Sequence, residues 1–175
     1  MAEHSTVRRT ATRELVLLAL LTALLLVLQV ALSAIPNVEM VTLLITLYTL
    51  HYRQKVLAII YVFVLCEGLV YGFGFWFVNY LYVWAVLWGL VMLVCSTKSP
   101  VAWALILAMY GLCFGLLCAI PYLFIGGPGM AWAYFISGIP FDIAHGLSNF
   151  AITLMLFTPL RRLFTLANRK LGLTH

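Results

Sequence analysis

The chain has 175 residues, of which 65% are hydrophobic and 9% are charged, with a net charge of +5 and a mean hydropathy of +1.11. Soluble domains average about 45–50% apolar and about 25% charged residues, so this composition excludes an ordinary soluble globule, a disordered chain and a nucleic-acid-binding domain. A transmembrane helix takes about 20 residues, so the length allows about six or seven spans and no sizeable soluble domain.

Six apolar runs predict membrane helices along the chain. Their expected bounds are about 15–34, 38–52, 56–74, 78–95, 101–124 and 140–160, with a short extra helical piece at about 130–137. The runs are too uniformly apolar for amphipathic surface helices and too long for barrel strands. The sequence therefore predicts an all-α integral membrane protein, a six-transmembrane-helix bundle that forms a single membrane domain over residues 1–175.

Two segments leave room for other interpretations. The first run follows a basic head, as a signal peptide does, but its apolar stretch is longer than the about 7–15 residues of a signal peptide, so we expect a retained helix. Glycines flank the piece 130–137, which is therefore either a mobile lid or part of the last helix.

The positive charges predict the orientation of the bundle. With six spans and a cytoplasmic N-terminus, every Lys and Arg falls on the cytoplasmic side: Arg8, Arg9, Arg13, Arg53, Lys55, Lys98, Arg161, Arg162, Arg169 and Lys170. This is the positive-inside pattern, and it predicts a multi-pass protein of the cell membrane with both termini cytoplasmic. Anionic lipid of the inner leaflet accounts for the net charge, so no nucleic-acid partner is expected.

Five polar residues interrupt the apolar runs in the outer half of this topology: Glu39, Glu67, Asp142, His145 and Asn149. Ionisable groups inside a membrane are costly, so they face the bundle interior or a wet cavity. The last three are spaced i, i+3 and i+7, which places them on one helix face. Glu67 is the deepest, about 10 Å below the outer end of its helix at 1.5 Å per residue.

Aromatic and amide side chains gather in the same outer half. Together with the five polar residues they predict an outward-facing pocket with a polar floor and aromatic walls. The further candidate substrate-binding residues are Asn37, Tyr71, Trp76, Asn79, Tyr80 and Trp84.

These candidates also have structural interpretations. Asp142 follows Pro140 and would satisfy free N–H groups at a helix start, and Glu39 would be a first-turn acid in headgroup water. His145 and Asn149 would bond between helices, and the aromatic residues would form an interfacial belt. Two GxxxG pairs, Gly68/Gly72 and Gly111/Gly115, indicate close helix packing.

Motifs for cofactors and catalysis are missing from the sequence. The candidates show no recognised metal-ligand spacing, no P-loop or dinucleotide motif occurs, and there is no GxSxG. The four cysteines, which have no CxxC spacing, are expected to be small buried hydrophobes: Cys66, Cys95, Cys113 and Cys118. We therefore expect no metal, no cofactor, no ATP site and no enzymatic activity.

Three motifs together point to a family. They are Ala19-x-x-x-Ala23 in the first helix, the Ile-Pro-Asn-Val-Glu corner at 35–39, and Gly-Ile-Pro-Phe-Asp-Ile-Ala-His-Gly-Leu-Ser-Asn-Phe at 138–150. With six short helices they resemble, over essentially the whole chain, the substrate-binding S components of energy-coupling factor (ECF) vitamin transporters.

The resemblance implies a subunit that captures a vitamin or related micronutrient from outside. It would dock through Ala19 and Ala23 on a transmembrane T subunit that works with two ATPase subunits. The resemblance also implies ligand contacts from the outer loops and the outer ends of the later helices, which are the positions already chosen on polarity.

The charge of the outer half restricts the ligand. It holds carboxylates and no Lys or Arg, so an anionic ligand is disfavoured and a neutral or cationic nitrogen heterocycle is favoured. Thiamine-like pyrimidines, pyridoxamine-like amines, deazapurine bases and corrinoids are all compatible. Two alternatives stay open, namely a structural subunit of a membrane complex and a small intramembrane enzyme that uses Glu67, Asp142 and His145.

Overall fold

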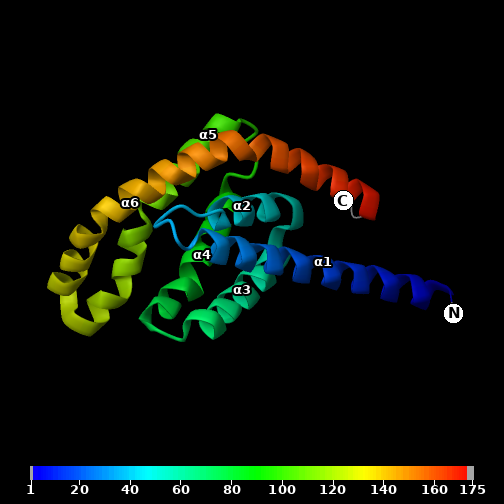
Figure 1. Ribbon diagram of the computed structural model, residues 1–175. Coiled ribbons are helices and arrows are strands. Elements are labelled where there is room, and N and C mark those ends of the chain that lie inside the picture. Colours follow the sequence, from blue (N-terminus) through cyan, green and yellow to red (C-terminus); the bar gives the residue numbers. More distant parts are fainter. Residues whose placement is uncertain (1, 173–175) are drawn as a thin grey trace.

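The computed structural model describes residues 2–172, with side chains over residues 12–170. The described chain is helical and contains no strand, which confirms the predicted all-α class (Figure 1). The side chains of Arg8 and Arg9, which enter the predicted charge pattern, lie outside the description. The elements are α1 (Ala2–Leu32), α2 (Val41–Tyr52), η1 (Arg53–Lys55), α3 (Val56–Tyr71), α4 (Phe75–Leu93), α5 (Pro100–Leu112) and α6 (Phe114–Leu171).

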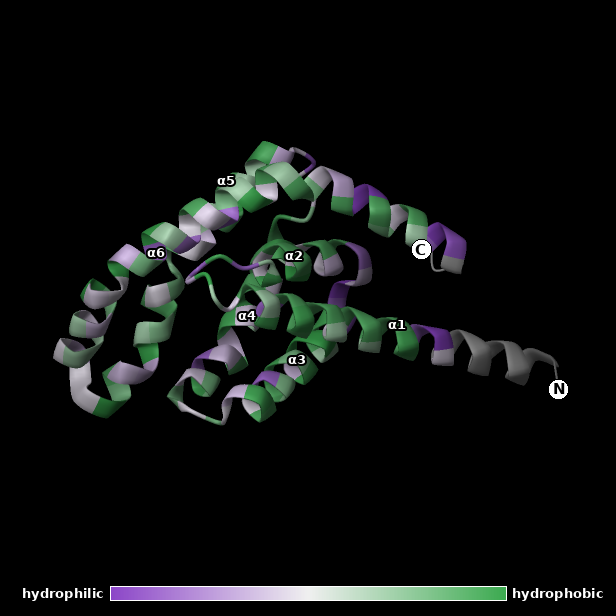
Figure 2. Ribbon diagram, in the orientation of Figure 1, coloured by the Kyte–Doolittle hydropathy of each residue, from purple (hydrophilic) through white to green (hydrophobic). Residues whose placement is uncertain are grey.

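Four helical stretches of the described residues are long and apolar enough to cross a membrane: Thr12–Leu32, Val41–Tyr71, Phe75–Leu93 and Pro100–Lys170. Figure 2 shows the same pattern, with apolar residues over most of the bundle and hydrophilic ones concentrated near η1 and at the far end of α6. The composition and the structure therefore agree on a helical protein of membrane-spanning character.

Two of these stretches change direction internally. The chain turns at η1, where Arg53 has a φ of 54°, and again at Gly127, where φ is 76° (Figure 1). A positive φ of this size suits glycine, and Pro128 restarts the helix directly afterwards, a position that proline favours. Gly127 thus divides α6 into a first arm, residues 114–126, and a second arm, residues 128–171.

Several helix bounds differ from those predicted. The expected piece 130–137 and the expected helix 140–160 both lie in the continuous second arm of α6, because the single hydrogen bond lost at a proline is tolerated where neighbouring helices pack. The expected helix 101–124 is instead interrupted at Cys113 (φ −94°, ψ 0°), where α5 ends and the first arm of α6 begins.

The centre of the structure is α2. Its residues from Val41 to Thr49 are all buried, and it contacts α1, α3, α4 and α6. A helix that is apolar on every side is stable only in such a position. Two of its buried hydroxyls are satisfied within the helix, since Thr46 and Thr49 donate to the carbonyls four residues before them at 2.8 and 2.7 Å. The Tyr48 hydroxyl donates to the Leu21 carbonyl of α1, and Thr42 Oγ1 has no partner among the described residues.

Helix α5 lies along the second arm of α6, and glycines allow the close approach. An added Cβ at Gly111 would stand 3.0 Å from the Gly146 backbone, and one at Gly115 would stand 2.3 Å from the Asp142 carboxylate. The Gly111/Gly115 pair therefore packs closely against another helix, as its spacing predicts. Farther along, the buried rings of Trp103 and Phe157 stack with centroids 5.9 Å apart.

This crossing generates a stability prediction. We expect Gly111→Ala to destabilise the protein by about 1–3 kcal/mol, because the new methyl group forces backbones apart. The matched control is Gly89→Ala in α4, where no atom lies within 4 Å of the added Cβ and helix propensity favours alanine by up to about 1 kcal/mol. Thermal unfolding of both variants in detergent is the measurement. A Gly111→Ala protein as stable as Gly89→Ala would contradict the close approach.

Candidate ligand-binding site

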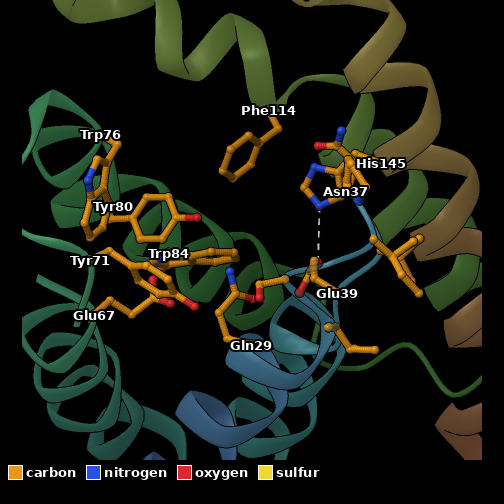
Figure 3. Close-up of a pocket in the computed structure, with 15 residues that line it drawn as sticks. Gln29, Asn37, Glu39, Glu67, Tyr71, Trp76, Tyr80, Trp84, Phe114 and His145 are labelled. Atoms are coloured by element: carbon orange, nitrogen blue, oxygen red, sulfur yellow. Dashed lines mark hydrogen bonds and ion pairs between the residues drawn. The ribbon is translucent and has the colours of Figure 1, made fainter.

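A cavity of about 390 Å³ lies among loop 33–40, the C-terminal ends of α1 and α3, the first half of α4 and both arms of α6 (Figure 3). Most of the predicted binding residues line it: Asn37, Glu39, Glu67, Tyr71, Trp76, Tyr80, Trp84 and His145. The remaining lining residues are additions to the prediction: Gln29, Leu32, Ser33, Ile35, Pro36, Val38 and Phe114. Among these described lining residues there is no Lys or Arg.

Two polar atoms in this cavity have no partner. The side chains of Glu67 and Trp84 are both 2% exposed, and neither Glu67 Oε1 nor Trp84 Nε1 has a hydrogen-bond partner among the described residues. Leaving a buried donor or acceptor unpaired costs about 1–3 kcal/mol, and more for a charged group. The site therefore holds one free acceptor and one free donor, which a bound molecule would satisfy.

The aromatic wall comes from a single face of α4. Trp76, Tyr80 and Trp84 are spaced by four residues, so their rings follow one another along the helix. Consecutive centroids lie 5.1 and 5.4 Å apart, with interplanar angles of 82° in both pairs. Phe114 continues the series, 5.9 Å from Trp84. In Figure 3 the α4 rings face Phe114 and His145 across the cavity, which suits a planar or cationic ligand.

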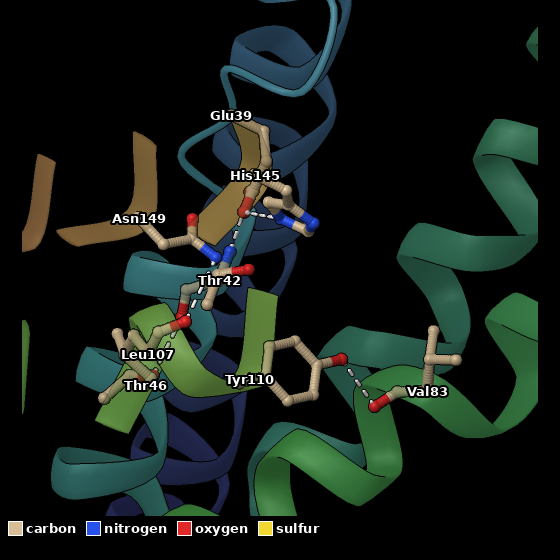
Figure 4. Close-up of polar contacts among 8 residues, drawn as sticks. All are labelled: Glu39, Thr42, Thr46, Val83, Leu107, Tyr110, His145 and Asn149. Carbon is tan, nitrogen blue, oxygen red and sulfur yellow. Dashed lines mark hydrogen bonds and ion pairs between the residues drawn. The ribbon is translucent and has the colours of Figure 1, made fainter. Parts of the chain in front are cut away.

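Glu39 connects loop 33–40 to α2 and to the second arm of α6 (Figure 4). Its Oε2 accepts from the backbone N–H of Thr42 at 2.8 Å, and its Oε1 lies 3.2 Å from His145 Nε2. Burial raises the pKa of the Glu39 carboxyl, but the hydrogen bond and charge of His145 and the hydrogen bonds from Thr42 outweigh it, so the pKa lies below the ordinary 4.5. Glu39 is not in the first turn of α2, where we expected it, but precedes its N-cap Met40; from there it binds the first turn of α2 and contacts His145.

Three predicted binding residues lie outside the cavity. Asp142 Oδ1 accepts from the backbone N–H of Gly115 at 2.8 Å, and Asn149 Nδ2 donates to the Leu107 carbonyl at 3.4 Å. Asn79 Oδ1 lies 3.2 Å from the Tyr82 hydroxyl. These contacts favour the structural interpretation, with one difference for Asp142: the N–H group it satisfies belongs to the first arm of α6 and not to its own helix start.

Among the missed lining residues, Gln29 carried a usable signal, since it is a polar side chain inside an apolar run, the criterion that singled out Glu67. Phe114 carried no such signal, because its position depends on the break at Cys113.

No family model, no curated protein and no solved structure matches this chain. The functional inference therefore depends on the geometry of the cavity.

The lowered pKa of Glu39 predicts a pH-dependent stability. A carboxylate whose pKa is depressed by folding stabilises the protein above its unfolded pKa, and this contribution is lost as the pH falls through the folded pKa. We therefore expect wild type to exceed Glu39→Gln by about 1–2 kcal/mol at neutral pH, with the difference shrinking below about pH 4.5. Thermal unfolding of both proteins between pH 3 and 7 tests this. A difference that grows on acidification would contradict the contact.

Proposed function

We propose that this chain is the substrate-binding membrane subunit of a micronutrient importer of the ECF type, and that its ligand is a neutral or cationic nitrogen heterocycle. The observation that carries the proposal is the pair of unpartnered buried atoms, Glu67 Oε1 and Trp84 Nε1, in one cavity. A buried carboxylate without a partner is costly in the free protein, and a ligand that donates to it recovers that cost on binding.

The chemistry of the lining residues indicates which hydrogen-bonding groups, rings and charges the ligand would carry. A ring N–H or an exocyclic amine would donate to Glu67, and a ring nitrogen or carbonyl would accept from Trp84. The α4 rings would stack on a flat ring or hold a positive charge. An acidic vitamin would meet Glu39 and Glu67 without a cation to balance its charge.

The size of the cavity narrows the ligand further. A volume of about 390 Å³ is at the small end of ligand pockets, which measure about 300–1,000 Å³. It suits a compound of one or two rings, such as a pyrimidine, a pyridine amine or a deazapurine base, and disfavours a corrinoid.

The proposed topology has six spans. The turns at η1 and Gly127 divide the four apolar stretches into six segments, with α5 and the first arm of α6 counted as one segment across Cys113, and both termini are cytoplasmic in this arrangement. Along α6, His145 lines the cavity and Arg161 and Arg162 lie about 24 Å away at 1.5 Å per residue. The cavity carboxylates Glu39 and Glu67 then lie toward the outside and the cations toward the cytoplasm, as the positive-inside rule requires.

The proposed contact with the T subunit lies on α1. Ala19 and Ala23 are exposed, whereas Leu21 and Leu25 on the same helix are buried against the core. Two small side chains one turn apart allow another helix to approach closely. A T subunit with two ATPase subunits would supply the energy for release.

Binding is tested by a thermal-shift screen of the purified chain in detergent. The panel holds water-soluble vitamins, their precursors and modified nucleobases. We expect a neutral or cationic heterocycle to raise the Tm of wild type and to bind Glu67→Gln and Trp84→Phe at least about tenfold more weakly, because the first variant loses the negative charge that strengthens a hydrogen bond from the ligand and the second loses a hydrogen-bond donor.

The matched control is Asp142→Asn, which changes a carboxylate outside the cavity and keeps an oxygen for the Gly115 N–H. It should bind the ligand as wild type does. An acidic vitamin as the tight ligand would overturn the charge argument. A silent panel with folded protein would favour a structural subunit. Turnover of a ligand, abolished in a His145 variant that still binds it, would favour the enzyme.

Docking is tested separately from binding. We expect Ala19→Leu/Ala23→Leu to reduce uptake of the ligand by intact cells at least about tenfold, because the larger side chains block the approach of the T subunit. Ligand affinity of the isolated chain should change less than about twofold. Ala151→Leu, at an exposed alanine of α6, is the control and should leave both unchanged. Equal loss of affinity and uptake would instead assign Ala19 and Ala23 to packing of this chain.

A further inference from the structure

A second cavity, of about 500 Å³, lies far from the first and carries the opposite charge. Four cations line it: Lys98 from the segment before α5, and Arg161, Arg162 and Arg169 from the second arm of α6. No carboxylate is among its described lining residues. Residues more than 60 positions apart in the chain thus contribute charges of one sign to one groove, which we call the basic groove.

The end of α6 is held in place by contacts with α2. The Tyr52 hydroxyl donates to Asn168 Oδ1 at 2.7 Å, and His51 Nε2 lies 3.5 Å from Thr165 Oγ1. Asn168 is buried. The basic groove is therefore formed by an anchored segment and not by a free helix end.

The four cations have no acidic partner within the described chain, where Glu14, at this end of the bundle, pairs with Lys55. The Arg161 guanidinium lies 5.7 Å from the centroid of the Phe157 ring, which orients it in the groove wall. Guanidinium groups present a planar fork of donors that matches phosphate oxygens. The groove has the charge and the donors for a phosphate group.

The surroundings of the groove are apolar. Pro100, Phe157 and Leu166 form part of its wall, and Leu163 and Leu166 are 60% and 55% exposed. Exposed leucines interleaved with arginines are typical of a helix that lies in the headgroup region of a membrane. A soluble phosphate would use only the cations, whereas a phospholipid would use both the cations and the leucines.

We propose that the basic groove binds the phosphate of an anionic phospholipid, with the acyl chains against Leu163 and Leu166. This inference does not depend on the identity of the ligand in the first cavity. The bound lipid would fix the end of α6 at the membrane surface, because each cation near an anionic leaflet adds to the attraction.

Native mass spectrometry of the full chain in a mild detergent tests the proposal, with phosphatidylglycerol, phosphatidylcholine and inorganic phosphate as the added probes. We expect retention of phosphatidylglycerol well above that of phosphatidylcholine. Arg162→Gln/Arg169→Gln should weaken retention of phosphatidylglycerol by roughly thirtyfold, which corresponds to roughly fivefold for each cation. Both residues are exposed, and thermal unfolding of the variant checks that it folds.

The matched control is Arg13→Gln/Lys170→Gln, which removes two exposed charges that do not line the groove. It should retain phosphatidylglycerol nearly as wild type does. Equal weakening in both double variants would reduce the effect to net charge and overturn the site. Inorganic phosphate that competes as strongly as the lipid would overturn the lipid assignment and leave a simple phosphate site. Equal retention of phosphatidylcholine would exclude recognition of the negative charge.

Discussion

The structure of the cavity depends on one costly feature, a carboxylate buried without a partner inside an apolar helix bundle. Glu39 and Glu67 line the same space, yet only Glu39 has partners, in Thr42 and His145. Evolution of a merely stable bundle would remove Glu67 or pair it, because its desolvation is costly. Under the proposed function, a molecule bound beside Glu67 and the unpaired Trp84 indole offsets this cost.

The rest of the fold holds the walls of this space in position. The close approach of α5 and α6 at Gly111 and Gly146 leads directly to His145, which contacts Glu39 and so reaches loop 33–40. Glu39 in turn bonds the start of α2, the most buried helix. The α5–α6 crossing, His145, loop 33–40 and the start of α2 therefore belong to one connected set of contacts.

Local patterns were sufficient for part of this structure. The apolar runs predicted the helical class, a charge inside a run singled out Glu67, and the aromatic residues of the outer half predicted pocket walls, where the structure places Trp76, Tyr80 and Trp84. The predictions that failed depended on contacts between residues far apart in the sequence. The partner of Asp142 is Gly115, 27 residues away, and nothing local shows that this carboxylate is already used. Pro140 suggested the start of a helix, but α6 continues through this residue because neighbouring helices pack against it.

The cavity also affects how long the protein persists in a cell before it is degraded. Under the proposed function, a ligand at 100 times its Kd adds about 2.7 kcal/mol to the stability of the folded state. Proteases that act on opened chains remove the less stable, empty form faster. The amount of this protein in its membrane would then rise and fall with the supply of its ligand, without any change in synthesis.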